Sequence, residues 1–281
     1  MSYITKKRIG DKTYFYEVKN IRVGKNKWKK ETKYLGKNNP QITFLTDIQI
    51  KKLDQIKQFY NKTITNKAKQ EYLKNFSTVF TYDTSAIEGS ELTLQETRMI
   101  LRENLTPKHP TNTRDILETK NHEKAFYYML NYNNQLNLDF ILTLHKILKQ
   151  NVDEDIAGKI RECNLNVLNY KPPHYTELKS ALNKFITWYN KNKTKQNPFE
   201  LAVLTHLYFV CIHPFVDGNG RISRLIANFI LNQHNYPLLN IPVKKRQDYY
   251  SVLADYDTEK TEKPFVQFLL KLYLKEYKDY L

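Results

Sequence analysis

The stretch IHPFVDGNGRISR, residues 212–224, joins two segments in which apolar residues recur at helical spacing. Pro214 must end the first helix, because its ring removes a backbone donor and collides with the preceding turn. Gly218 and Gly220 permit positive φ angles, and the second helix begins beside them, so its unpaired N–H groups and positive dipole end face one space. Asn219-Gly220 alone is typical of a β-hairpin turn, but the helical flanks exclude a hairpin. The stretch therefore predicts a polyphosphate site between two helices.

Four side chains give this site its chemistry. Arg221 and Arg224 are three residues apart, so they share a helix face and both can reach an anion. Asp217 suits an anion site only with a cation between the charges, and a carboxylate together with phosphate oxygens is a usual way to hold Mg²⁺. His213 is the side chain best suited to accept a proton near neutral pH. A base, anion donors and a metal ligand together indicate attack of a hydroxyl on phosphorus.

Helical spacing continues through most of the chain after about residue 45. Segments 115–132 and 138–149 are predicted to be helices, and prolines indicate loops at 106–113 and 170–174. Three further helices are indicated by apolar stripes: Leu178, Leu182, Phe185, Ile186 and Tyr189; Leu204, Leu207, Tyr208 and Cys211; and Ile222, Leu225, Ile226, Phe229 and Ile230. The predicted fold class is therefore mainly α.

The first 40 residues differ in character from the rest. They hold 12 Lys and Arg against 3 Asp and Glu, so they carry +9 of the net charge of +16. Aromatic and β-branched runs at 12–18 and 27–35 are separated by turn residues such as Gly10 and Gly24, which predicts a small β-meander that ends near Pro40. We expect two domains, a basic β-rich segment over 1–40 and a helical domain over 41–281.

Composition limits the class of protein. Of the 281 residues, 41 % are hydrophobic and 13 % aromatic, which favours a folded chain over a disordered one. No apolar stretch is long enough to cross a bilayer, and the N-terminus lacks a secretory signal, so we expect a cytoplasmic protein with no membrane contact. Cys163 and Cys211 have no metal-ligand spacing, and Cys211 is interpreted as a small buried residue rather than a nucleophile.

Residues 213–224 are similar at every defined position to the motif of the Fic family, HxFx[DE]GNGRxxR. The resemblance implies a protein adenylyltransferase, in which a histidine deprotonates a Ser, Thr or Tyr hydroxyl that attacks the α-phosphate of ATP. It implies His213 as the base, Asp217 as the ligand of Mg²⁺ (or Mn²⁺), and Arg224 as the γ-phosphate contact. The α- and β-phosphate cradle would comprise Gly218, Asn219, Gly220 and Arg221. The intact GNGR sequence favours transfer of a nucleotide over the phosphorylation typical of Doc-type relatives.

The resemblance covers roughly residues 45–275 and implies a Fic-type helical bundle. Gly158-Lys159-Ile160-Arg161 is similar to the family's GxxR step, and residues 162–173 resemble its flap, a β-hairpin that pairs with the target protein's backbone. Tyr250 lies in a stretch that resembles the one near the adenine, and Asp257 occupies a position where relatives often carry Asn. The resemblance also implies a homodimer.

Thr84-Ser85-Ala86-Ile87-Glu88-Gly89 is similar to the family's inhibitory pattern, [ST]xxxE[GN]. Gly89 is typical of a helix stop, and a glutamate in the last helical turn opposes the helix dipole, so local stability does not explain Glu88. The resemblance implies Arg224 as its partner. Thr84, Glu88 and Gly89 would then belong to an inhibitory helix near residues 76–89, in the same chain and N-terminal to the motif.

Other functions remain open at this point. One is a different Fic-type transfer, of UMP, a phosphoryl group or phosphocholine, or the removal of AMP from a modified protein. Another is a nucleic-acid-binding regulator that senses ATP, because residues 6–37 interleave Lys and Arg with aromatic residues.

Overall fold

The computed structural model describes residues 2–9, 12–22, 28–36, 43–107, 113–167, 170–259 and 261–281. The chain divides into two compact units, Met1–Thr43 and Phe44–Leu281. The turns predicted at Gly10 and Gly24, the end of the β segment at Pro40 and most of the loop predicted at 106–113 lie outside the described residues.

The N-terminal unit contains three strands, β1 Ser2–Ile9, β2 Lys12–Arg22 and β3 Trp28–Gly36. They pair antiparallel in the order β1-β2-β3, with an irregularity between Phe15 and Tyr16. On one face the Tyr34 ring contacts the rings of Tyr14 and Tyr16, with centroids 6.2 Å and 5.4 Å apart. Cross-strand aromatic pairs of this kind stabilise a small sheet.

The second unit is helical, which confirms the predicted fold class. Its α-helices are α1 Asp47–Thr63, α2 Asn66–Ile87, α3 Leu94–Arg98, α4 Thr113–Asn131, α5 Leu138–Lys149, α6 Leu178–Asn192, α7 Pro198–Ile212, α8 Asn219–Gln233, α9 Arg246–Glu259 and α10 Lys263–Glu276. Three short helices lie between them, namely η1 Met99–Glu103, η2 Tyr175–Glu177 and η3 Val243–Lys245, and η4 Lys278–Tyr280 follows α10.

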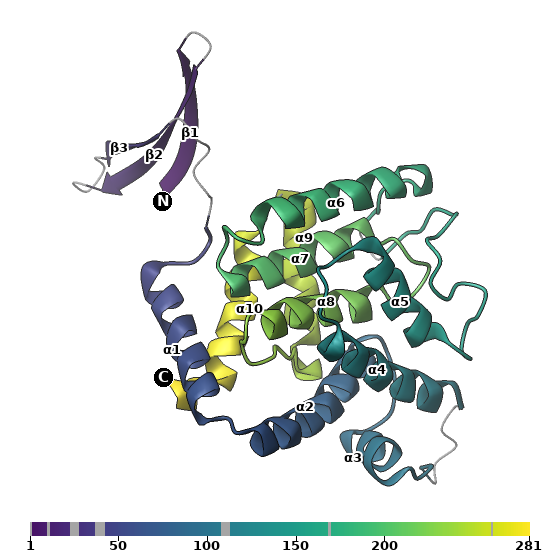
Figure 1. The fold of residues 1–281 in the computed structure, drawn as a ribbon. Coiled ribbons are helices and arrows are strands. Elements are labelled where there is room, and N and C mark those ends of the chain that lie inside the picture. Colours follow the sequence, from purple (N-terminus) through teal and green to yellow (C-terminus); the bar gives the residue numbers. More distant parts are fainter. Residues whose placement is uncertain are drawn as a thin grey trace. The chain divides into compact units, whose positions relative to one another are not determined.

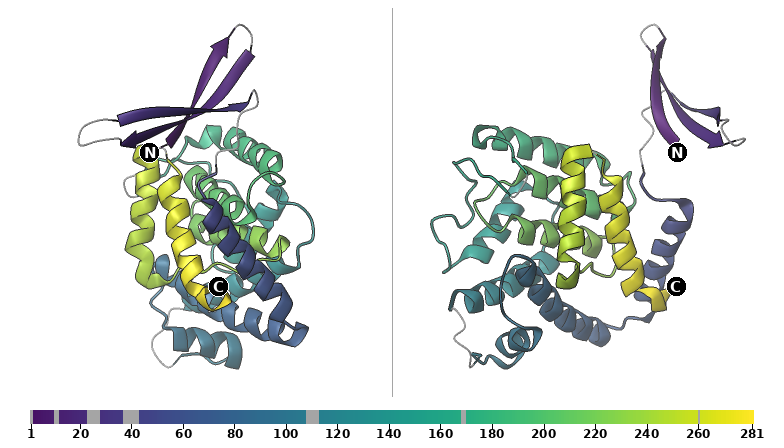
Figure 2. Two further views of the ribbon diagram at one scale, coloured as in Figure 1. Left: turned by 90° about the vertical axis from the view of Figure 1, so that its left-hand side faces the viewer. Right: turned by 180° about the vertical axis from the view of Figure 1, so that it is seen from behind.

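Helices α7 and α8 form the centre of this unit (Figures 1 and 2). Every residue of α7 from Phe199 to Leu207 is buried, as expected for a helix that is apolar on all sides. Helix α7 packs against α6, α8 and α10, and α8 packs also against α2, α4 and α5. The loop between α7 and α8 is therefore supported on several sides by helices that are distant in sequence.

The flap predicted over 162–173 is only partly described. Within its described residues the one β pairing is an isolated antiparallel bridge between Val167 and Tyr170, with N–O distances of 3.0 Å and 2.8 Å. Residues 168 and 169 lie outside the description, so the hairpin flap stays a prediction.

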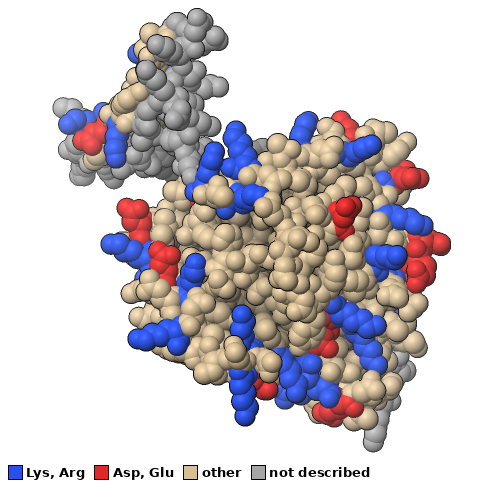
Figure 3. All heavy atoms as spheres, in the orientation of Figure 1, with Lys and Arg blue, Asp and Glu red and all other residues tan. Residues whose placement is uncertain are grey.

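Charge is mixed on the surface of the helical unit. On the face drawn in Figure 3, Lys and Arg side chains are interspersed with Asp and Glu. Among the described helices, none combines the length and the apolar character that crossing a bilayer requires.

Candidate active site

His213 lies where α7 ends and the loop to α8 begins. It is the C-cap of α7, with φ 50° and ψ 57°, a left-handed conformation that is unusual for a residue other than glycine. Its backbone N–H donates to the Phe209 carbonyl at 3.2 Å, and its Nδ1 lies 3.2 Å from the Val210 carbonyl oxygen. Because a carbonyl only accepts, Nδ1 carries the proton and Nε2 keeps its lone pair. Burial lowers the pKa of His213, which favours this neutral, basic form.

The loop after His213 is closed by the side chain of Asn219. Its Oδ1 accepts from the Phe215 N–H at 2.9 Å, and its Nδ2 donates to the Phe215 carbonyl at 2.8 Å. The Asn219 side chain is buried and satisfied in this way, so it stabilises the loop, and only its backbone N–H is left to contact an anion.

His145, on α5, packs against the same loop. Its ring stacks on the Phe215 ring, with centroids 3.7 Å apart and planes at 2°. The Gly158 N–H donates to His145 Nδ1 at 3.0 Å, so Nε2 carries the proton and donates to the Asp217 carbonyl at 3.0 Å. His145 thus joins the turn at Gly158 to the loop, which the sequence did not indicate.

A second buried histidine, His122 on α4, gives the fold a pH dependence. Burial lowers the pKa of His122 to about 3, while its Nδ1 lies 2.8 Å from Thr81 Oγ1. Below about pH 6.5 the unfolded chain takes up a proton that the folded chain does not, so stability falls as the pH drops toward 3. We expect the free energy of unfolding of His122→Asn, which keeps a hydrogen bond to Thr81, to fall by about 1–2 kcal/mol less than that of wild type between about pH 6.5 and 5. Urea unfolding at the two pH values measures this, and equal losses would contradict it.

The start of α8 presents groups that can bind an anion. Gly218 is its N-cap, with φ 87°, and a Cβ there would lie 3.1 Å from Leu148 Cδ2 and 3.4 Å from the His145 ring. Glycine is therefore required both for the conformation and for the close packing. The N–H groups of the first turn of α8 have no partner within the helix, and they carry its positive dipole end.

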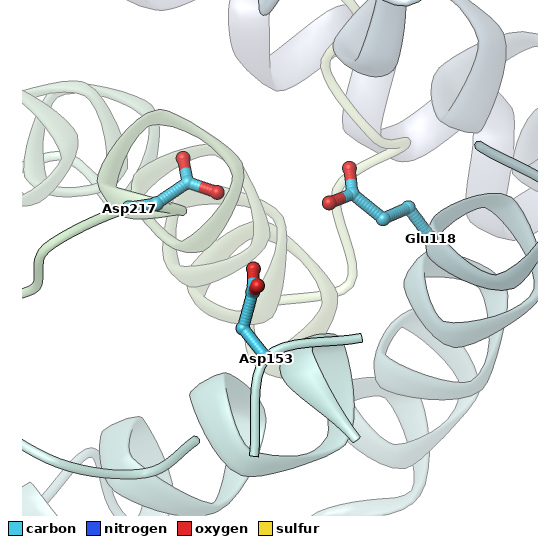
Figure 4. Close-up of side chains that lie close together, drawn as sticks. All are labelled: Glu118, Asp153 and Asp217. Carbon is cyan, nitrogen blue, oxygen red and sulfur yellow. The ribbon is translucent and has the colours of Figure 1, made fainter. Parts of the chain in front are cut away.

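Asp217 belongs to an acidic group that the sequence did not predict. Figure 4 shows the Glu118, Asp153 and Asp217 carboxylates turned toward one another, with ligand oxygens within 4.8 Å. Burial alone would raise the pKa of Asp217, but Arg221 and Lys149 outweigh it and lower that pKa far below its usual range.

Arg221 is held by this group rather than left free. Its Nη1 lies 2.5 Å from Glu118 Oε2 and its Nη2 lies 2.8 Å from Asp217 Oδ2. Its Nε is buried and has no hydrogen-bond partner among the described residues. Arg221 therefore orients Asp217, and only its Nε side remains for a phosphate.

The carboxylate of Asp217 is of the ligand type that Mg²⁺ prefers. Carboxylate oxygens are hard ligands, and 44 % of the Asp217 side chain is exposed, against 17 % for Glu118 and 28 % for Asp153. Asp217 is thus the most exposed carboxylate of this group.

Helix α2 brings Glu88 to the start of α8. The helix ends at Ile87 with Glu88 as C-cap, and Gly89 follows at φ 106°, as the predicted helix stop requires. The Ser90 N–H donates to the Ser85 carbonyl at 3.0 Å and the Gly89 N–H to the Ala86 carbonyl at 3.1 Å, which completes a Schellman motif.

Glu88 pairs with Arg224, the partner that the sequence resemblance implied. Its Oε1 contacts Arg224 Nη2, and 30 % of the Glu88 side chain is exposed against 3 % for Arg224. A Cβ at Gly220 would collide with the same Oε1, so the carboxylate lies directly over the first turn of α8. The Thr84 carbonyl also accepts from Arg224, at 3.4 Å. Burial lowers the pKa of Arg224, but the neighbouring Glu88 carboxylate raises it, and the net change is a rise.

Arg161 anchors both ends of the flap segment to the site. This buried guanidinium donates to the carbonyls of His213 at 2.8 Å, Cys163 at 2.6 Å and Pro173 at 2.7 Å. The Tyr170 hydroxyl adds a bond to the Cys211 carbonyl. The flap segment is therefore attached directly to the backbone beside His213.

Tyr250 and Asp257, predicted near the adenine, both lie on α9. The Tyr250 hydroxyl donates to the Ile87 carbonyl at 3.1 Å, so Tyr250 contacts the end of α2 beside Glu88. Asp257 lies near Tyr170 of the flap. Burial is the main cause that raises the pKa of Tyr170, and the nearby Cys211 and Asp257 raise it further. Tyr250 thus interacts with the end of α2, and Asp257 interacts with Tyr170 of the flap.

Comparisons with known proteins agree with this geometry. Residues 135–231 match the model of the Fic/DOC family. The chain is 27 % identical over 242 residues to protein adenylyltransferase fic-1 of Caenorhabditis briggsae and 33 % identical over 191 residues to protein adenylyltransferase Fic of Drosophila ananassae. These alignments cover 84 % and 67 % of this chain but only 47 % and 38 % of the relatives, so the chain spans half their length or less.

Solved structures give the same result. A Fic domain containing signaling protein from Bacteroides thetaiotaomicron matches with a TM-score of 0.74 and 26 % identity, over 82 % of this chain and 95 % of that one. Fic-1 from Caenorhabditis elegans matches with a TM-score of 0.74 and 26 % identity, over 83 % of this chain and 70 % of that one. The site and these matches together show that this chain belongs to the Fic/DOC family.

Proposed function

We propose that this protein transfers AMP from ATP to a Ser, Thr or Tyr hydroxyl of a protein target, and that Glu88 inhibits the transfer. The observation that carries the proposal is the Glu88–Arg224 pair over the first turn of α8, beside His213. The relatives named protein adenylyltransferase support the reaction type. Because the chain matches less than half of their length, the activity is proposed for this chain and not transferred from them.

The unpartnered donors of Arg224 support the binding of a triphosphate at the start of α8. Its Nε and Nη1 are buried and have no hydrogen-bond partner among the described residues. Buried donors without partners cost about 1–3 kcal/mol each, more when charged, so a guanidinium satisfied on one side only suits a further anion. A γ-phosphate would supply the missing acceptors, and the first turn of α8 would receive the preceding phosphates.

The proposed reaction gives each of these groups a role. His213 Nε2 accepts the proton of the target hydroxyl while that oxygen forms a bond to the α-phosphorus. The bond from the α-phosphorus to the bridging oxygen of the β-phosphate breaks, and pyrophosphate leaves. Pyrophosphate remains next to Arg224 and the N-terminus of α8, which stabilise its developing charge.

Mg²⁺, or Mn²⁺, is the cofactor proposed for Asp217. A bound metal would offset part of the charge of the phosphates. Asp217 is suited to this because His145 fixes its backbone and Arg221 fixes its carboxylate.

The protein target is proposed to dock on the flap, residues 162–173. Arg161 ties both ends of this segment to the backbone of the catalytic loop, so a peptide paired along it would have its hydroxyl close to His213. A homodimer and binding of nucleic acid by residues 6–37 stay predictions.

The test is to incubate the protein with ATP labelled on the α-phosphate and with ATP labelled on the γ-phosphate, in the presence of Mg²⁺ and cell lysate. Label from the α-position alone, on this chain or on a target, supports AMP transfer. Label from the γ-position that disappears when the protein is omitted would contradict it in favour of a phosphoryl group, and mass spectrometry of the modified hydroxyl separates AMP, UMP and phosphocholine. Loss of label from a pre-modified target on adding the protein would reveal AMP removal.

A further inference from the structure

Lys149, the last residue of α5, is a lysine with a side chain that is 0 % exposed. Its Nζ lies 3.4 Å from Glu118 Oε1 and 3.1 Å from Asp153 Oδ2, and it also contacts Asp217 Oδ2. Lysines are almost never buried to this extent without charged partners, and here one ammonium contacts all three carboxylates of the acidic group.

The surrounding charges are balanced. Arg221 bridges Glu118 and Asp217, as described above. Arg114 bridges Glu118 and Asp153, from Nε at 3.3 Å and from Nη2 at 2.5 Å. Three carboxylates therefore face three cations, and the ammonium is the one that all three carboxylates share. Without Lys149 the same oxygens, within 4.8 Å of one another, would have the composition and spacing of a divalent-cation site.

We propose that Lys149 is the resident cation of this acidic group and excludes a free divalent metal from it, so that metal reaches Asp217 only together with a nucleotide. A divalent ion among these oxygens would lie beside the ammonium and be repelled by it. Nucleotide phosphates reduce this repulsion, because they add negative charge on the exposed side of Asp217. This second part rests on the proposed function, whereas the exclusion of free metal does not.

The experiment measures Mn²⁺ binding to the nucleotide-free full chain by electron paramagnetic resonance. Wild type is expected to bind weakly, and Lys149→Met to bind at least about tenfold more tightly, because three carboxylates then face two cations. Lys146→Met is the matched control, since Lys146 lies on the same helix but is exposed, and it should bind as wild type does. Adding Asp153→Asn to Lys149→Met should remove most of the gain.

Thermal unfolding gives a second measurement if Lys149→Met is unstable. Mn²⁺ should raise the Tm of this variant, or its yield of folded protein, and should leave wild type and Lys149→Arg unchanged. Equal Mn²⁺ affinity in wild type and Lys149→Met, or tight binding to nucleotide-free wild type, would overturn the proposal. A non-hydrolysable ATP analogue separates the two hypotheses, since a failure of Mn²⁺ to bind wild type even with the analogue counts against the proposed function.

Discussion

Replacing His213 with alanine is expected to lower AMP transfer by about 10²–10⁴-fold, the usual contribution of a general base, while ATP binding persists. The expectation follows from the tautomer, because the Nδ1–H bond to the Val210 carbonyl leaves Nε2 as the proton acceptor next to the loop. No described contact of the His213 side chain supports the phosphate site, so binding should change little. Transfer is measured with α-labelled ATP, in a background that carries Glu88→Gly so that the starting rate is high.

A matched control is His234→Ala. His234 follows the last residue of α8, about 22 Å along the helix from its N-terminus, so it tests the loss of an imidazole remote from the reaction. The control should retain transfer. Transfer at the parental rate in His213→Ala would show that another group accepts the proton.

The central part of the site was predictable from sequence because its signals are local. Pro214 ends one helix, Gly218 begins the next and Gly89 stops the helix that carries Glu88, and each is a backbone effect of a single residue. The pair of Glu88 with Arg224 came from the family pattern and not from local physics. A glutamate at a helix C-terminus indicated only that a distant cation was needed.

The residues that support the site were not predictable from sequence, because they are brought together from distant parts of the chain. Glu118, Lys149 and Asp153 come from α4, α5 and the turn after α5, and nothing in their spacing indicates that they meet Asp217. A lysine at the end of a helix is more often exposed near the dipole's negative end, so its burial depends on tertiary packing alone. His145 is similar, because its two hydrogen bonds are to backbone groups.

The structure adds a supporting role for two residues of the predicted phosphate cradle. The side chain of Asn219 binds the Phe215 backbone, and Arg221 is held by Glu118 and Asp217, so both contribute to the loop before any phosphate is present. Tyr250 contacts the end of α2 through its hydroxyl. That bond connects the proposed adenine side of the site to the helix that carries Glu88.

Replacing Glu88 with glycine is expected to raise AMP transfer by about 10²-fold, which is the cost that a misplaced reacting group commonly carries. In the wild type its carboxylate is bound to the Arg224 guanidinium, the group proposed to hold the γ-phosphate. It also lies over the first turn of α8, which is proposed to receive the preceding phosphates. ATP that binds beside it must leave one of these contacts unmade, and its α-phosphorus is then displaced from His213. Removing the carboxylate restores both contacts. The rate of label incorporation from α-labelled ATP, compared between variant and wild type at the same ATP concentration, measures the effect.

Three variants separate charge from helix structure. Glu91→Gly places the same glycine three residues later at an exposed position, and it should leave the rate at the wild-type level. Glu88→Gln keeps the size but removes the charge, so it should raise the rate less than Glu88→Gly does, because an amide still fills the space above Gly220. The C-cap is left intact, since the Schellman bonds of α2 use only the backbone, and the backbone effect of glycine at position 88 should cost no more than about 1 kcal/mol. Loss of the carboxylate also leaves the buried Arg224 without its ion-pair partner, so thermal unfolding must show that Glu88→Gly is folded. An unchanged rate in Glu88→Gly, with the fold preserved, would mean that the Glu88–Arg224 pair stabilises the helical unit without inhibiting it.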